Sequence, residues 1–262
     1  MDVDHNNNEP TVTTHRDGFD WRSIKLGWYI LAALFLYSLI ATIALSRSNR
    51  ALNELKVAGG SAVSSETPSA LTTAPQGLWF PIPGARLPQD DMYLPTAPRD
   101  YRRGVNQGFD FYGTSSAVPI NFGTPVIASA DGVVIRADRD YKELDNEQWL
   151  SLLDKVAADG ATEDDLNRLR GRQIWIRLPD NRVLRYAHLS DIRQGLAEGQ
   201  EVYRGQVIGF VGNSGTDDGI KGTTRGARLH FEVWNPDNTF FGQNAETLEQ
   251  VRADSASLFV GP

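Results

Sequence analysis

Residues 226–234 read GARLHFEVW, and polar and apolar residues alternate in the middle of this stretch. Successive side chains of a β-strand point to opposite faces, so Arg228, His230 and Glu232 share one face while Leu229 and Phe231 share the other. The stretch therefore predicts a strand with one apolar face and one face of titratable groups. His230 on that face is a metal ligand, the remnant of one, or a side chain of an ordinary polar face, and alternation alone leaves all three open.

Further short β-type runs precede this strand, separated by glycine and proline. They read FGTPVIASADGVVIRA at 122–137, RQIWIRLPDNRVLRYAHL at 172–189 and YRGQVIGFVGNSG at 203–215. The second run contains Pro179-Asp180-Asn181 between two apolar segments, which indicates a hairpin with a polar turn. The sequence predicts a mainly β domain built as an antiparallel sheet or sandwich.

One segment, at about 141–171, departs from the β pattern. Asp145 with Gln148, and Thr162 with Asp165, have the spacing of helix capping boxes, and each pair is followed by leucines at helical intervals. We expect a helical hairpin inserted between two strands, serving as a scaffold or partner surface rather than in chemistry. The tail, AETLEQVRADSASLFVGP, predicts a further short helix.

The N-terminal third has a different composition. Residues 26–45, LGWYILAALFLYSLIATIAL, form an uncharged run about 20 residues long, which is the length of a transmembrane helix. A cleaved signal peptide is the alternative, but a long polar segment precedes the run and no clear A-x-A site follows it. We therefore expect a polar tail at 1–25, a span at 26–45, a juxtamembrane segment and flexible linker at 46–77, and a folded domain at 78–262. Flanking lysines and arginines balance, so charge does not set the orientation.

Composition excludes several chemistries. The chain has no cysteine, so thiolate zinc sites, disulfides and cysteine nucleophiles are absent. A net charge of −7 argues against nucleic acid as a partner. Of the four histidines, His5 and His15 lie in the polar N-terminal tail, which leaves His188 and His230 for chemistry in the folded domain.

The order of the segments GFDFYG, FGTPVIASADGVVIRA, RYAHLS, YRGQVIGFVGNSG and RLHFEVW resembles the lysostaphin-type (LytM) zinc endopeptidases, which cut peptide cross-links in bacterial cell walls. The resemblance covers roughly Phe80 to Pro236, apart from the helical insertion. Members of that family carry an H-x-G-x-D motif, a Y-x-H-L segment and an H-x-H motif. The histidine and aspartate of the first motif and the second histidine of the last bind zinc.

Two of the family's histidines are replaced in this chain. Asn106 stands where the first zinc histidine is expected, whereas Asp110 matches the zinc aspartate. His188 matches the catalytic histidine of the Y-x-H-L segment. Arg228 replaces the assisting histidine of H-x-H, and His230 matches the third zinc ligand. The resemblance thus implies a vestigial site, with Asp110 and His230 as an incomplete metal set.

The chemistry of the replacements argues against zinc. A catalytic zinc usually has three strong protein ligands, and a neutral asparagine oxygen suits harder cations better. A permanently charged arginine two residues from His230 repels a bound dication. We expect Arg228 to take the place of the metal in a bidentate ion pair with Asp110, with His188 and His230 neutral beside it. We also expect the long 216–226 segment to cover or reshape the groove.

These observations favour a membrane-anchored, catalytically inactive LytM-like domain that binds peptidoglycan or regulates a wall hydrolase, with no cofactor. Two alternatives stay open: an active zinc endopeptidase, and a structural subunit that docks on a membrane protein through the helical insertion. A wall function implies an extracytoplasmic C-terminal domain and a cytoplasmic N-terminus.

Overall fold

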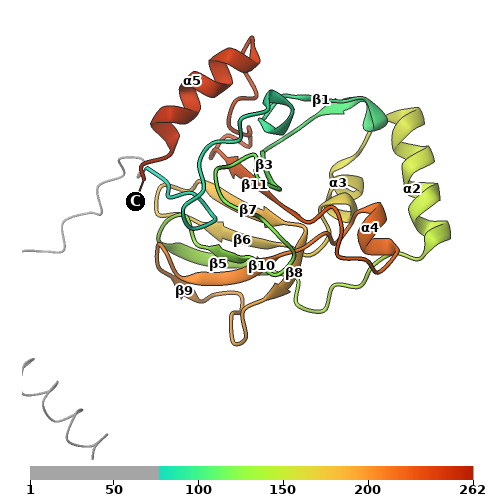
Figure 1. Cartoon of the computed structure of the whole chain (residues 1–262), viewed down its shortest axis with the longest axis horizontal. Coiled ribbons are helices and arrows are strands. Elements are labelled where there is room, and N and C mark those ends of the chain that lie inside the picture. Colours follow the sequence, from blue (N-terminus) through green and yellow to red (C-terminus); the bar gives the residue numbers. More distant parts are fainter. Residues whose placement is uncertain (1–76, 262) are drawn as a thin grey trace, which may run out of the picture. The chain divides into compact units, whose positions relative to one another are not determined.

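The computed structural model describes residues 77–261, and these form three antiparallel sheets, one of them only two short strands, with helices at their margins (Figure 1). The predicted mainly β, antiparallel architecture is confirmed. The predicted tail and span, and nearly all of the predicted linker, lie outside the described residues. Within 77–261, no helix is long and apolar enough to cross a membrane.

The largest sheet has six strands and contains the 226–234 stretch near one edge. Its strands, in sheet order, are β3 (Phe109–Tyr112), β11 (Arg228–Trp234), β7 (Val183–Ala187), β6 (Ile174–Arg177), β5 (Gly132–Ala137) and β9 (Glu201–Val202). The predicted hairpin is the pair β6–β7, which turns through residues 178–182. A second sheet has three strands, in the order β4 (Pro125–Ile127), β10 (Val207–Val211) and β8 (Leu189–Ile192).

The apolar face of β11 packs into the main core as the alternation predicts. Leu229 and Phe231 are fully buried and Val233 is nearly so, within a cluster of side chains from both sheets. His230 and Glu232, on the other face of the strand, are also buried. The polar face is therefore covered as well, which explains why its charges must find partners inside the protein.

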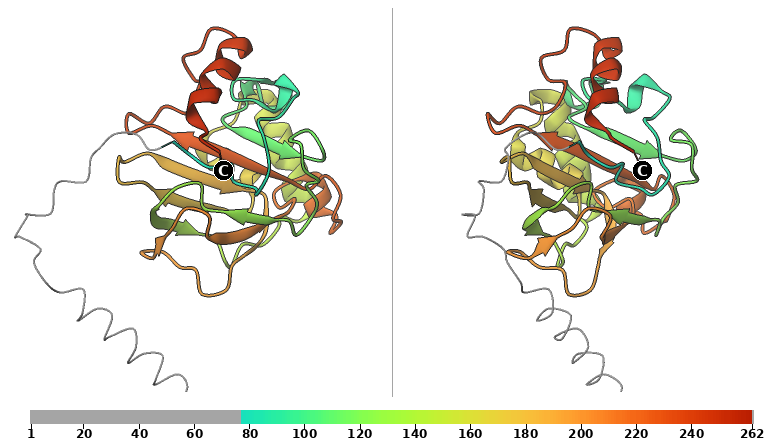
Figure 2. Two further views of the ribbon diagram at one scale, coloured as in Figure 1. Left: turned by 60° about the vertical axis from the view of Figure 1, so that its left-hand side comes forward. Right: turned by 90° about the vertical axis from the view of Figure 1, so that its left-hand side faces the viewer.

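Two helices at 146–170 cover this polar face (Figures 1 and 2). They are α2 (Asn146–Asp159) and α3 (Glu163–Arg170), and each begins at a complete capping box, made by Asp145 with Gln148 and by Thr162 with Asp165. The predicted helical hairpin is confirmed. Its apolar side chains form a second small core, made of Trp149, Leu152, Val156, Leu166 and Leu169.

The first and last residues of the described domain lie side by side and form a β-bridge. Leu78 is fully buried and pairs with Phe259, which follows helix α5 (Leu248–Leu258), the predicted tail helix. The remaining elements are short: β1 (Pro98–Arg99), β2 (Gly104–Val105), α4 (Asp217–Ile220) and two 3-10 turns, η1 (Asp91–Tyr93) and η2 (Asp100–Arg102).

Candidate functional site

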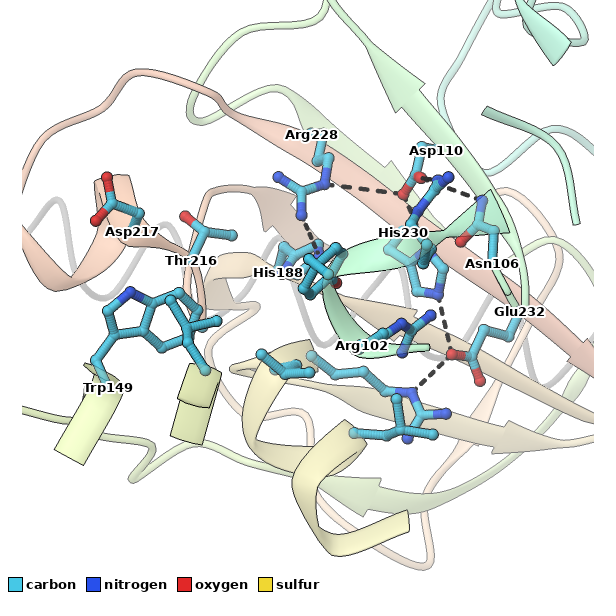
Figure 3. Close-up of a pocket in the computed structure, with 17 residues that line it drawn as sticks. Arg102, Asn106, Asp110, Trp149, His188, Thr216, Asp217, Arg228, His230 and Glu232 are labelled. Atoms are coloured by element: carbon cyan, nitrogen blue, oxygen red, sulfur yellow. Dashed lines mark hydrogen bonds and ion pairs between the residues drawn. The ribbon is translucent and has the colours of Figure 1, made fainter. Parts of the chain in front are cut away.

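The register of β3 against β11 brings the predicted site residues together. His230 lies directly opposite Asp110 across the antiparallel pair, and His230 also pairs with Ala187, which precedes His188. Asn106 lies just before β3, and Arg228 begins β11. Asn106, Asp110, His188, Arg228 and His230 therefore meet at one end of the sheet, as Figure 3 shows.

Asp110 is the centre of the cluster and accepts hydrogen bonds at both oxygens. Oδ1 accepts from His230 Nδ1 at 2.9 Å, and Oδ2 accepts from Arg99 Nη2 at 2.8 Å and from Asn106 Nδ2 at 3.2 Å. Burial by itself raises the pKa of Asp110, but the charges of His230, Arg228 and Arg99 outweigh burial and hold this pKa well below its usual range.

The predicted bidentate pair between Arg228 and Asp110 does not form. Arg228 Nε lies 3.8 Å from Asp110 Oδ1, outside hydrogen-bonding distance, whereas Arg99 makes the close ion pair. Arg99 comes from β1, which lies outside the motifs of the resemblance, and no sequence signal marked it. The counter-charge of Asp110 is thus supplied by a residue eleven positions earlier in the chain.

Asn106 turns its amide nitrogen toward Asp110. Nδ2 lies 3.1 Å from the carbonyl oxygen of Leu94, 2.7 Å from that of Gly108 and 3.2 Å from Asp110 Oδ2. Three acceptors around one atom fix that atom as the NH₂ donor, because an amide oxygen there would face three other oxygens. Asn106 therefore offers a hydrogen-bond donor where the family has a metal-binding histidine.

His230 is held between two carboxylates. Nδ1 faces Asp110, and Nε2 lies 2.9 Å from Glu232 Oε1. Burial lowers the pKa of His230, but the charges and hydrogen bonds of Asp110 and Glu232 outweigh burial and raise this pKa above its ordinary value. Because a neutral ring would leave one lone pair facing a carboxylate, His230 is an imidazolium. The predicted neutral state of His230 is therefore wrong.

Glu232 is a site residue to which sequence reasoning gave no role, although its place on the polar face of the strand was visible. It is fully buried, and Oε1 accepts from Arg170 Nε at 2.6 Å while Oε2 accepts from Trp234 Nε1 at 2.5 Å. Arg170 is the last residue of α3 and also donates to Gln107 Oε1 at 2.6 Å. The helical insertion thus supplies a charged group to the site, in addition to the expected role as a scaffold or partner surface.

His188 is the neutral histidine of the site. Its Nδ1 donates to the carbonyl oxygen of Ser214 at 2.8 Å, and its Nε2 accepts from Arg228 Nη2 at 3.0 Å. Burial and the charge of Arg228 lower the pKa of His188 well below its ordinary value. Its backbone lies in the left-handed region, with φ of 58°, an uncommon conformation for a non-glycine residue. Its amide donates to the carbonyl of Arg170 at 2.8 Å, which holds this conformation in place.

These residues line one side of a pocket of about 360 Å³. The helical insertion forms an apolar wall from Trp149, Leu153, Leu166 and Leu169, and residues 215–217 form part of the rim. We expected the 216–226 segment to reshape the groove. Its first two residues, Thr216 and Asp217, do line the pocket. The polar lining consists mainly of Arg99, Arg102, Asp110, Arg170, His188, Arg228, His230 and Glu232.

Residues 155–243 match the model of Peptidase family M23. The predicted resemblance to the lysostaphin-type peptidases is confirmed. The matched M23 segment runs from within α2 past β11 and includes His188, Arg228 and His230, whereas Asn106 and Asp110 precede it. A search of curated proteins finds no match to the chain.

Several solved structures are similar to part of this chain. A zinc-containing peptidase from Vibrio cholerae is 22% identical, with a TM-score of 0.40, and the alignment covers 65% of this chain and 40% of that one. Helicobacter pylori Csd3 is 19% identical (TM-score 0.36; 68% and 38% covered), and the lysostaphin catalytic domain from Staphylococcus simulans is 22% identical (TM-score 0.35; 56% and 82% covered). This chain spans 40% or less of the length of the first two of these structures.

The donor set of this site does not fit the zinc of the M23 family. Asn106 presents N–H groups rather than an oxygen, and both ring nitrogens of His230 carry protons directed at carboxylates. Asp110 is already bonded by Arg99, Asn106 and His230. In the described part of the chain, no group of three histidine, aspartate or glutamate side chains is placed to hold a metal ion. The geometry instead forms a closed network of charge-assisted hydrogen bonds.

Proposed function

We propose that this chain is a membrane-anchored M23-fold module that binds cell-wall peptides without hydrolysing them. The observation that supports the proposal most directly is the bonding of Asp110, whose oxygens contact Arg99, Asn106 and His230 at 2.8–3.2 Å. A zinc ion bound at Asp110 would have to displace a guanidinium and an imidazolium. Without a zinc ion, the site lacks the Lewis acid and the activated water that zinc supplies to such peptidases.

The pocket retained beside this network supports a binding role. It combines an apolar wall with charged groups, which is the composition of a ligand site. Membrane anchoring rests on the sequence of residues 26–45, and an extracytoplasmic location of the domain follows from the proposed wall ligand. Regulation of a wall hydrolase is compatible with the same pocket, since a bound wall peptide can localise such a partner.

A purely structural role through the helical insertion receives less support. On α2, Trp149, Leu152 and Val156 are buried against the domain, and Leu150 is the large apolar side chain left exposed. A helix that uses its apolar face internally has little apolar surface for docking.

Metal content and wall binding test the proposal together. The full chain, purified in detergent, is incubated with zinc, dialysed and analysed for metal, and is then mixed with purified wall sacculi. We expect no stoichiometric zinc, no release of wall peptides, and co-sedimentation with sacculi. One tightly held zinc per chain with chelator-sensitive hydrolysis would establish the peptidase alternative, and failure to co-sediment would refute the wall-binding role.

A further inference from the structure

The pocket beside the Asp110 network is rich in positive charge. Its lining contains four arginines and the protonated His230 but only three carboxylates, although the whole chain has a net charge of −7. A basic pocket in an acidic protein raises the local concentration of small anions. The charge balance therefore favours a ligand that carries a negative group. The arginines are Arg99, Arg102, Arg170 and Arg228, and the carboxylates are Asp110, Asp217 and Glu232.

Arg228 is the most accessible cation of this lining. Its side chain is 30% exposed, whereas that of Arg99 is 17% exposed and those of Arg170 and His230 are below 10%. Arg102 is buried as well. A ligand group that enters the pocket can therefore contact the guanidinium of Arg228, whereas the deeper cations are covered by protein atoms.

The charge of Arg228 is incompletely neutralised by the protein. In the described part of the chain its one close carboxylate is Asp110, which lies 3.8 Å from Nε and so beyond hydrogen-bonding distance. Asp110 is already bonded to Arg99, Asn106 and His230, so it cannot turn toward Arg228 without losing one of these partners. Arg228 thus keeps both charge and donors for a ligand.

A neutral partner holds the guanidinium in place. Nη2 of Arg228 donates to Nε2 of His188 at 3.0 Å, and Nδ1 of His188 donates to the carbonyl oxygen of Ser214 at 2.8 Å. The remaining nitrogen of Arg228, Nη1, has no acceptor among the described residues. Figure 3 shows this nitrogen without a dashed line, on the side of Thr216. A guanidinium that is already positioned loses little freedom on binding, which favours affinity.

We propose that Arg228 anchors a carboxylate group of a peptide ligand in this pocket. A guanidinium binds a carboxylate through charge-assisted hydrogen bonds. The same pocket, of about 360 Å³, is lined by Leu153, Leu166 and Leu169, which offer apolar contact to the rest of a short peptide. The net charge of −7 disfavours an extended polyanion. The carboxylate chemistry rests on the pocket, whereas the origin of the peptide in the cell wall rests on the proposed function.

The replacement at position 228 then has a role of its own. A histidine at this position of H-x-H assists catalysis in the resembled peptidases. An arginine side chain stays charged and has no lone pair to take up a proton, so it cannot act as a base. It can recognise an anion, and Arg228 therefore changes this position from a catalytic group to a binding group.

Calorimetric titration of the full chain in neutral detergent tests the proposal with two peptide acids. Acetyl-alanyl-alanine has its carboxylate at the chain end, and acetyl-glutamyl-alanine amide has it on a side chain. Acetyl-alanyl-alanine amide has none. We expect at least one acid to bind about tenfold more tightly than this amide, and the tighter acid shows where the natural carboxylate lies. The preference should shrink at high salt.

This comparison changes only the ligand, so it does not depend on the folding of a variant. If neither acid binds more tightly than the amide, the proposal is wrong. If acetate alone binds as tightly as the better acid, the peptide assignment is wrong. Nitrogen NMR locates the effect, because the ring nitrogens of His188 should shift when the acid binds to its hydrogen-bond partner Arg228. Unchanged His188 resonances at saturating acid would overturn the placement at Arg228.

Three variants provide a second test. Arg228→Gln should reduce the affinity for the acid to that of the amide, and Arg228→Lys, which keeps the charge, should retain part of the preference. Arg225→Gln is the matched control, with unchanged affinity expected, because Arg225 is 80% exposed and does not belong to the pocket lining. If Arg228→Gln binds the acid as tightly as the parent does, the proposed anchor is refuted.

The sacculus assay separates this inference from the proposed function. If the peptide acid binds through Arg228 but sacculi do not bind, the carboxylate anchor stands and the wall role fails. If sacculi bind equally well to the parent and to Arg228→Gln, and neither acid is preferred over the amide, the wall role stands and the anchor fails.

Discussion

At the scale of single residues, two buried histidines in ring contact have opposite protonation states. His188 and His230 have ring centroids 5.9 Å apart, yet one faces a carbonyl and a guanidinium while the other faces two carboxylates. The pattern follows from the partners, because only a protonated nitrogen can face a carboxylate favourably. The charge of His230 in turn contributes to the lowered pKa of His188.

Nitrogen NMR of the full chain can read both states, since the chain has four histidines. At pH 7.5 we expect His230 to be doubly protonated and His188 to be neutral with its proton on Nδ1. Because the pKa of His230 is raised on folding, its stabilising contribution is complete below about pH 6.5 and is lost as the pH rises through the folded pKa. His230→Gln should remove this pH-dependent part of the unfolding free energy. A neutral His230 at pH 7.5 would contradict the described network.

Stability should depend on Arg99 more than on Arg228. Arg99 is hydrogen-bonded to buried Asp110, so Arg99→Gln should lower the free energy of unfolding by about 1.5–3 kcal/mol. The contact of Arg228 with Asp110 is longer and the side chain is 30% exposed, so Arg228→Gln should cost less than about 1 kcal/mol. Denaturant titration of both variants gives the comparison. A larger loss for Arg228→Gln would restore the pair that the motif replacement suggested.

Zinc binding should return only in part when the two replaced histidines are restored. Asn106→His with Arg228→His completes the family's set around Asp110 and His230, so we expect the double variant to bind zinc more tightly than the parent. Arg99 still competes for Asp110, so adding Arg99→Met should raise zinc affinity further. Calorimetry with zinc, with exposed Arg103→Gln as the control, measures each step. No gain in the folded triple variant would mean that other groups exclude the metal.

At the scale of elements, the helical insertion is docked through two glycines. Gly171, at the end of α3, has φ of +66°, and a Cβ there would lie 2.3 Å from the backbone carbon of Ser214. Gly215 approaches equally closely from the other side, where a Cβ would lie 2.5 Å from the nitrogen of Gly171. Side chains at either position would push α3 away from the loop that positions His188, because Ser214 accepts from His188 Nδ1.

Gly171→Ala should therefore lower the free energy of unfolding by about 2 kcal/mol or more, since both the backbone conformation and the contact oppose a methyl group. Gly222→Ala is the matched control. Gly222 has φ of +64°, but a methyl group there would meet nothing within 4 Å, so only the conformational cost of about 1 kcal/mol should appear. Denaturant unfolding measures both variants, and equal losses would show that close packing at Gly171 contributes nothing.

At the scale of the whole molecule, the proposed wall role requires the pocket to lie outside the cytoplasm. Residues 26–45 predict the one span that would place it there, with residues 1–25 inside. A reporter active only outside the cytoplasm, fused after Pro262, should be active in cells, and a cytoplasmic reporter at the same position should be silent. The opposite pair of results would exclude a wall ligand for this pocket.

The sequence by itself determined the strand pattern, the β6–β7 hairpin, both capping boxes and the two missing histidines, because each is encoded in residues a few positions apart. Tertiary structure alone decided the partners of the buried charges. The bond between Asp110 and His230 joins positions 120 residues apart, and Arg170 meets Glu232 across 62. No local pattern marks Arg99 as the counter-ion of Asp110 or Arg170 as the counter-ion of Glu232. Those roles exist only once the strands pair and the insertion covers the polar face of β11, because burial makes each charge depend on the groups packed around it.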